Sequence, residues 1–107
     1  VKKALKNTRL IKELVKIIEN ELDYKIKDSI TYNRLIDHLK GCIDRVESKT
    51  TVVNPLMDVL KTELSEAFKI SKKIKKVLDE NLDYEIPEGE LGYLTIHINR
   101  IRKLKNS

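Results

Sequence analysis

The stretch ELGYLTIHI, residues 90–98, places apolar side chains at the spacing of one helix face. Leu91, Leu94 and Ile98 recur every three or four residues, which is typical of an amphipathic α-helix. The same stretch contains His97, one of only two histidines in 107 residues. The segment therefore predicts a helix that packs on a core and carries a histidine near its apolar face.

Outside this stretch the chain predicts four more helices with the same spacing. The first helix is expected at about 3–22 and the fourth at about 65–82. Ser29 or Thr31 is expected to cap the second helix, and a short third helix is expected to start at Asn54–Pro55. Pro87 opens the fifth helix, which contains the stretch quoted above. The expected core stripes are Ile11, Leu14, Val15, Ile18 and Leu22, then Leu35, Leu39, Cys42, Ile43 and Val46, then Leu56, Met57, Leu60 and Leu64, and finally Leu91, Leu94, Ile98 and Ile101. Residues 47–54 are expected to be a connection. The class is all-α, in a single domain of residues 1–107.

Composition limits the function further. Charged residues make up 36% of the chain, and the only cysteine, Cys42, excludes an internal disulfide and fits a reducing compartment. No apolar run approaches the ~20 residues that a membrane span needs, and the first residues lack the continuous apolar region typical of a signal peptide. The expectation is a cytoplasmic protein without a membrane contact. Because the chain starts at Val1 and its only methionine is Met57, we expect a fragment of a longer regulator.

The densest basic run, KISKKIKK, places four lysines on one helix face. Such a face can contact RNA or DNA, or it can be the solvated side of an amphipathic helix. The second interpretation is favoured, because no aromatic side chains interleave with the lysines to stack on bases. The residues concerned are Lys69, Lys72, Lys73 and Lys76.

A weak internal repeat relates IIENELDYKI, residues 17–26, to VLDENLDYEI, residues 77–86. Each copy closes a helix and leads through a polar loop into a helix with a histidine, His38 in one and His97 in the other. Each histidine lies roughly 80° from the centre of its apolar stripe, taking ~100° per residue. Both are therefore expected at the border of buried and wet surface, where another protein can reach them. Chance similarity of two amphipathic helix ends remains the alternative.

Three segments together resemble one family. ELGYLTIHI (90–98) closely matches the Glu-x-Gly-Tyr-Leu-x-x-His-Ile signature of the PTS regulation domain (PRD), the sensor module of sugar-operon transcription antiterminators. YNRLIDHLKGCIDRV (32–46) resembles that domain's other histidine helix, and NPL (54–56) matches the start of its third helix. The pattern is more similar to the second of the tandem modules in these proteins than to the first.

The resemblance implies a fold and a role. The fold is a compact five-helix bundle in which the first helix pairs with the fourth and the second with the fifth, with a short third helix across them. Similar domains are phosphorylated on histidine by the phosphocarrier protein HPr or by a sugar permease component of the phosphotransferase system. Phosphorylation changes homodimerisation, which controls a separate RNA-binding domain. A DNA-binding transcriptional activator of the same sensor family is the alternative.

The candidate phosphorylation sites are His38 and His97. Arg34 lies four residues before His38, and Arg100 lies three residues after His97, so each arginine can share its histidine's face and pair with a phosphate. The resemblance adds two supporting residues, Asp37 beside the first histidine and Arg45 at a later arginine position.

Other chemistry finds little support. The histidines lack the spacing of a metal site, Cys42 lies on an apolar stripe, and Gly89 and Gly92 form no phosphate loop. We therefore expect a non-enzyme without cofactor or metal. A helical nucleic-acid-binding domain and a dimerisation module with inert histidines remain as alternatives. The sequence names neither the sugar nor the operon.

Overall fold

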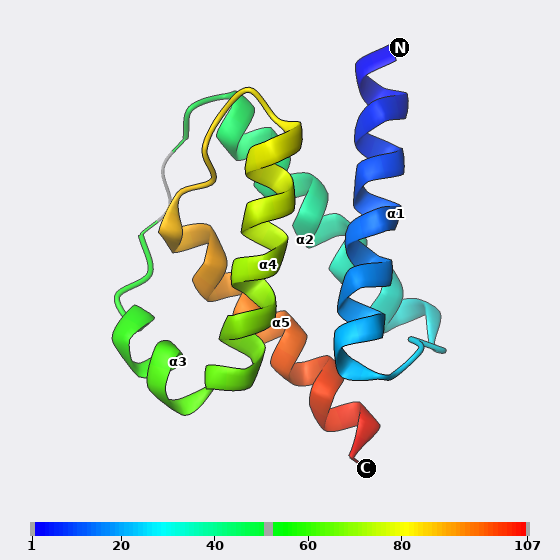
Figure 1. The fold of residues 1–107 in the computed structure, drawn as a ribbon, viewed down its shortest axis with the longest axis vertical. Coiled ribbons are helices and arrows are strands. Elements are labelled where there is room, and N and C mark those ends of the chain that lie inside the picture. The colour runs from blue at the N-terminus through cyan, green and yellow to red at the C-terminus, as the bar shows by residue number, and fades with distance from the viewer. Residues whose placement is uncertain (1, 51–52, 107) are drawn as a thin grey trace.

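Five α-helices form the structure, a computed structural model that describes residues 2–50 and 53–106 (Figure 1). The all-α prediction is confirmed, and these two ranges contain no strand. Within them, none of the helices combines the length and apolarity required of a membrane span. Val1 and Ser107 of the expected domain, and Thr51 and Val52 of the expected connection, lie outside the described residues. The helices are α1 (Lys2–Leu22), α2 (Ser29–Glu47), α3 (Met57–Glu63), α4 (Ser65–Asn81) and α5 (Glu88–Lys105).

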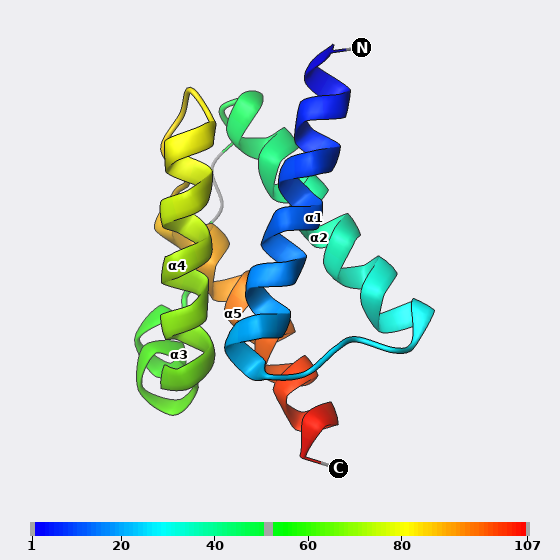
Figure 2. The same cartoon turned by 45° about the vertical axis from the view of Figure 1, so that its right-hand side comes forward.

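The expected helix pairs are present. α1 contacts α4 and runs antiparallel to it, and α2 crosses α5 in the opposite direction (Figures 1 and 2). The short α3 packs against α4 and α5. One feature differs from the expected pairing, because the most extensive contact in the bundle is between α4 and α5. As a result α5 lies against three other helices and forms the centre of the fold.

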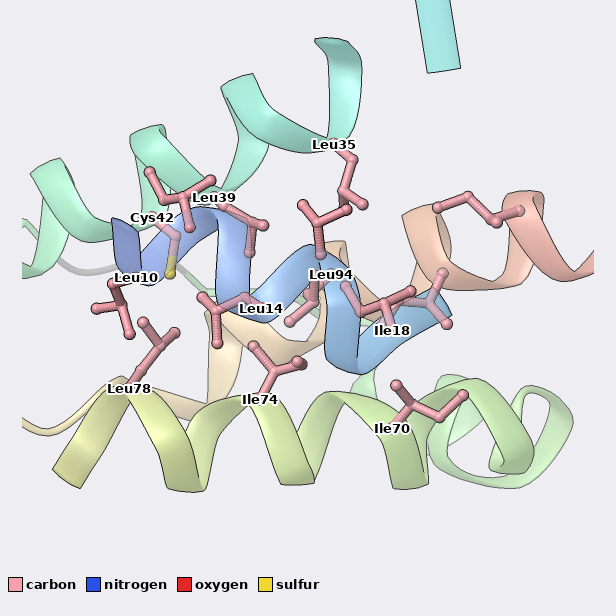
Figure 3. Packing of buried hydrophobic residues seen from close by; sticks show 14 of the residues in the cluster. Leu10, Leu14, Ile18, Leu35, Leu39, Cys42, Ile70, Ile74, Leu78 and Leu94 are labelled. Atoms are coloured by element: carbon pink, nitrogen blue, oxygen red, sulfur yellow. The ribbon is translucent and has the colours of Figure 1, made fainter. Parts of the chain in front are cut away.

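The core contains the predicted stripes of the first, second and fifth helices. Every expected core residue of the first, second and fifth helices is buried, and side chains from α1, α2, α4 and α5 meet in one cluster (Figure 3). Its most enclosed members carry large aliphatic side chains, whose removal from water is the main stabilising contribution. These are Leu14, Ile18, Leu35, Leu39, Ile43, Ile74, Leu78, Ile86, Ile98 and Ile101.

Two helix starts differ from the predictions. α2 is capped by Asp28, whose Oδ2 accepts a hydrogen bond of 2.9 Å from the backbone N–H of Thr31, so neither Ser29 nor Thr31 is the cap. An extended residue just before a helix can reach the N–H three residues on, which makes Asp28 the better-placed oxygen.

α3 begins two residues later than expected, at Met57. The Oδ1 atom of Asn54 accepts from the N–H of Leu56 at 2.9 Å, and this turn holds Pro55 outside the helix. In consequence Leu56 is 56% exposed, although it was expected in the core, and Leu60 is the buried residue of the short helix.

The internal repeat has a structural counterpart. In the first half, a carboxylate oxygen of Glu19 accepts from the N–H of Ile26 at 2.7 Å. In the second half, Asp79 accepts from the N–H of Ile86 at 2.8 Å. Each carboxylate lies seven residues before its amide, and each isoleucine turns into the core. The same bond therefore folds each loop back on its preceding helix and sets the direction in which the following helix leaves.

Candidate functional site

His38 and His97 lie side by side where α2 crosses α5. Their ring centroids are 4.5 Å apart, with the planes tilted by 38°. Both rings are half-buried, as predicted from their place at the border of the apolar stripes. The sequence repeat placed the histidines in equivalent positions, and the antiparallel crossing of the two helices brings these positions into contact.

Burial keeps both histidines neutral. Desolvation, with smaller contributions from His97 and Arg45, lowers the pKa of His38 to about 4, and Glu90 opposes the shift. The Nε2 atom of His38 is buried and has no hydrogen-bond partner among the described residues. Desolvation also lowers the pKa of His97, followed by the charges of Arg100 and Arg34. At pH 7 each ring therefore presents an unprotonated nitrogen, which is the form that can attack an electrophile.

A pocket of about 310 Å³ opens beside His97. Three cationic side chains line it, Arg34 from α2 and Arg100 and Lys103 from α5. Arg100 was expected beside His97, but Arg34 was expected beside His38, which does not line this pocket. Because α2 and α5 run antiparallel, the turn before His38 lies opposite the turn after His97. Both arginines consequently lie beside the same histidine, His97.

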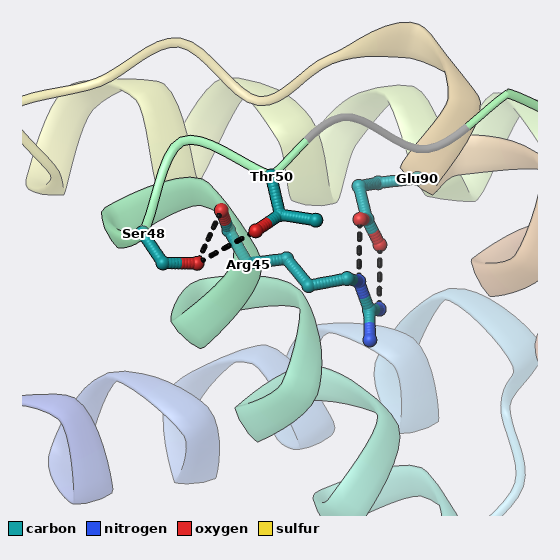
Figure 4. A network of polar contacts seen from close by, with 4 residues as sticks. All are labelled: Arg45, Ser48, Thr50 and Glu90. Carbon is teal, nitrogen blue, oxygen red and sulfur yellow. Dashed lines mark hydrogen bonds and ion pairs between the residues drawn. The ribbon is translucent and has the colours of Figure 1, made fainter.

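Arg45 is engaged in a paired interaction within the fold. Its Nε and Nη2 atoms each donate a 2.7 Å hydrogen bond to Glu90, one to each carboxylate oxygen (Figure 4). Glu90 is only 1% exposed, whereas the Arg45 side chain is 35% exposed. The hydrogen bonds with Glu90 also raise the pKa of Arg45. Arg45, expected as a supporting residue, therefore joins the end of α2 to the start of α5.

Comparison with known proteins identifies the family. The family model described as the PRD domain matches residues 12–101. The chain belongs to this family. The PRD is also similar to the PtsGHI operon antiterminator of Bacillus subtilis (strain 168), at 33% identity over 98 residues, covering 89% of this chain and 35% of that protein.

Two further relatives are also named as antiterminators. The GlcA/glcB genes antiterminator of Staphylococcus carnosus (strain TM300) is 37% identical over 103 residues, covering 90% of this PRD and 36% of the relative. Transcription antiterminator LicT of Bacillus subtilis (strain 168) is 28% identical over 100 residues, covering 90% of this PRD and 36% of that protein. This PRD thus spans about a third of the length of the curated relatives that it matches. No solved structure gives a significant match.

Two residues of the family signature have structural explanations that the sequence did not supply. The structure shows Glu90 as the buried partner of Arg45. Gly92 lies under the turn before α3, where an added Cβ would overlap the Asn54 amide and the Met57 sulfur. Both residues therefore position α5 of the PRD, and with it His97.

The remaining candidates lie apart from the histidine pair. Asp37 is exposed on α2, and within the described ranges no hydrogen bond or ion pair joins it to His38. Cys42 is buried in the core, where desolvation raises its pKa to about 12, in agreement with the prediction of a structural thiol. The described residues include no group of side chains suited to a metal ion.

The lysine face of α4 is exposed. Lys73 forms an ion pair with Glu21 of α1. The ammonium of Lys72 lies 5.7 Å from the ring centroid of Phe68, a partly buried side chain of the same helix. Neither arrangement offers a row of stacking surfaces for bases.

Proposed function

We propose that this PRD is a regulatory module that accepts phosphoryl groups on histidine from the sugar phosphotransferase system, and that phosphorylation controls an attached nucleic-acid-binding domain. The observation that carries the proposal is the pair of neutral rings, His38 and His97, in contact at the crossing of α2 and α5. The antiterminator names of the relatives support it. The module is not an enzyme and needs no cofactor, because the phosphorus arrives already activated.

The transfer is a simple displacement. The lone pair of a neutral imidazole nitrogen attacks the phosphorus of the phosphorylated donor, HPr or a permease component. The bond between phosphorus and the donor side chain breaks, and its electron pair returns to that side chain, which takes up a proton. The acceptor ring releases the proton of its other nitrogen. The product carries a group of about −2 charge with three acceptor oxygens, by analogy with other phosphorylated side chains.

A charge of this size can control assembly. A two-fold interface pairs the same patch of both subunits, so one phosphate per chain places two on a single interface. We propose that the PRD acts as a homodimer in the cytoplasm and that RNA is contacted only by a separate domain of the full protein. The alternative is the same module attached to a DNA-binding activator. The span 1–107 is then one module of a longer regulator.

Reconstituted phosphorylation tests the proposal. The domain is incubated with labelled phosphoenolpyruvate, the general phosphotransferase enzyme and HPr, and in a second arm with a permease component. The label is expected on histidine and should be lost in acid, as a phosphate bound to histidine is. The double variant His38→Ala/His97→Ala should take up no label. Lys69→Ala is the control on a remote surface. A wild-type domain that accepts no phosphate from either donor, or a double variant that stays labelled, contradicts the proposal.

Sedimentation tests the coupling to assembly. His38→Asp and His97→Asp each place a permanent negative charge at the crossing, and at least one should change the monomer–dimer balance. Asn20 is exposed on α1, so Asn20→Asp makes the same charge change away from the rings and serves as the matched control. An identical balance for wild type and both aspartate variants, over a wide concentration range, counts against control through dimerisation.

A further inference from the structure

The two histidines differ in what surrounds them. The Nε2 atom of His38 is buried, and no described residue bonds to it. An incoming donor must bring its phosphorus into line with an acceptor nitrogen, so a buried nitrogen is a poor first target. His97 instead lines an open pocket at the surface of the α2–α5 crossing. Access therefore favours His97.

The cationic side chains near the two histidines also differ in whether they are free to bind a phosphate. The strongest cationic contribution at His38 comes from Arg45, whose side chain is already held by Glu90 through two hydrogen bonds of 2.7 Å. If Arg45 moved to a phosphate on His38, it would leave the Glu90 carboxylate buried without a partner, which is strongly unfavourable. Arg34 and Arg100 beside His97 are exposed and need no such rearrangement.

The pocket suits a phosphoryl group in size and geometry. Its volume of about 310 Å³ is large compared with the 30 Å³ or so that one water molecule takes in the liquid. A phosphoryl group, with four heavy atoms, fits without separating the helices. Guanidinium groups bind phosphate through parallel hydrogen bonds, and here they approach from two different helices, Arg34 on α2 and Arg100 on α5.

We infer that His97 is the primary phosphoryl acceptor and that Arg34 of the neighbouring helix, together with Arg100, binds the phosphoryl group in the pocket beside it. The inference rests on the proposed function and names the site at which it operates. Arg34 thus acts on the histidine of the other half of the repeat, although it lies one helical turn before His38. A phosphate held in this way joins α2 to α5 at an end of their crossing.

Site mapping by mass spectrometry provides the first test. After transfer from HPr, most of the phosphate is expected on His97, with His38→Ala keeping most of the label and His97→Ala losing it. Circular dichroism of each variant confirms that it remains folded. Label found mainly on His38 overturns this inference while the proposed function stands. No label on either histidine, from either donor, removes the proposed function itself.

Arginine variants provide the sharper test, because they address the unexpected role of Arg34. Arg34→Gln and Arg100→Gln should each lower phosphorylation of His97 about tenfold, since each removes a charge-assisted hydrogen bond. The ³¹P resonance of phosphorylated His97 should shift in both. Arg102→Gln is the matched control, because it makes the same charge change on α5 at a residue that does not line the pocket. If Arg34→Gln lowers the label on His38 and leaves His97 unchanged, the assignment of Arg34 is wrong. Equal effects of all three substitutions would show only a general charge effect and would also overturn it.

Discussion

The helix–loop–helix of α1 and α2 and that of α4 and α5 share one plan but differ in how deeply their second helix is buried. Both close the loop with a carboxylate-to-amide hydrogen bond, and both carry a histidine at the same place. In α2 the buried side chains are all apolar. In α5 the buried set also contains Glu90, Thr95 and Asn99, because three other helices surround it.

The difference shows what a central helix requires. Buried polar groups need partners, and two of these have them in other helices. Glu90 pairs with Arg45 of α2, and the hydroxyl of Thr95 lies 2.8 Å from that of Ser71 in α4. The first half, with one side of α2 in solvent, needs no such pairs. The second half carries the histidine that lines the pocket.

The two histidine helices also differ in how they begin. α2 has a side-chain cap from Asp28, whereas α5 follows Pro87, which provides no side-chain hydrogen bond. The helices that precede them also end differently. Asp23, just after α1, has a positive φ of 50°, whereas Leu82, just after α4, has an extended backbone.

The largest effect should come from breaking the link between the two halves, the pair of Arg45 on α2 with the buried Glu90 on α5. Arg45→Ala leaves the Glu90 carboxylate buried and unpaired, and we expect a loss of about 3 to 5 kcal/mol in the free energy of unfolding. Urea denaturation measures it, with Arg102→Ala as the control of equal charge change. Replacing both partners, as Arg45→Met with Glu90→Leu, should recover most of the loss. A loss below about 1 kcal/mol would show that the link matters little.

Acid titration should separate the two histidines next. The folded pKa of His38 is about 4 and its ordinary value is 6.5, so between these values the unfolded chain binds a proton that the folded chain does not. Stability is therefore full above pH 6.5 and falls as the pH drops towards 4, by about 2 to 3 kcal/mol from His38.

The His38→Gln variant gives the measurement its control. Unfolding curves from pH 7 to 4 should be flatter for this variant than for wild type. His97→Gln should flatten them less, because the pKa of His97 is lowered in the same direction but His38 is the more strongly shifted group. Identical slopes for wild type and His38→Gln would show that the ring is protonated without penalty.

A smaller loss of stability is expected when the loop hydrogen bond shared by the two halves is removed. Glu19→Ala and Asp79→Ala each leave a partly buried backbone N–H without its acceptor, and each should lower stability by about 1 kcal/mol. Glu13→Ala and Glu80→Ala remove exposed carboxylates from the same two helices and serve as controls. Asp79→Ala also removes the ion pair of Asp79 with Lys75, so only a difference larger than such a pair contributes would mean that the halves use the bond differently.

The smallest effect concerns the cap of α2. Hydrogen bonds with Thr31 lower the pKa of Asp28 below its ordinary value of 3.8, so this contribution is present above that pH and is lost as the pH falls through the lowered value. Asp28→Asn should keep the cap and remove the dependence on acid, whereas Asp28→Ala should lower the unfolding midpoint slightly at pH 7. Amide exchange in the first turn of α2 reports the change. Unaltered exchange in the alanine variant would mean that the cap is unnecessary.

Much of the site could be predicted from the pattern of residues along each helix. Helical periodicity placed the histidines at the edge of the apolar stripes, and the repeat made them equivalent. The direction of Arg34 could not be predicted in this way, because a residue four positions before a histidine shares its helix face but can still point towards the next helix. The partner of Arg45 was hidden for a similar reason, since Glu90 is 45 residues away in sequence.

The sequence by itself determined the helical class, the core stripes and the membership of the PRD family, because these follow from local spacing and from motifs read along the chain. Only the tertiary structure decided that α4 packs most closely on α5, that Arg34 and Arg100 meet beside His97, and that Glu90 holds Arg45. Each of these depends on the angle and direction at which two helices cross. Such crossings are set by side chains interlocking across the whole core, and no single stretch of the sequence contains them.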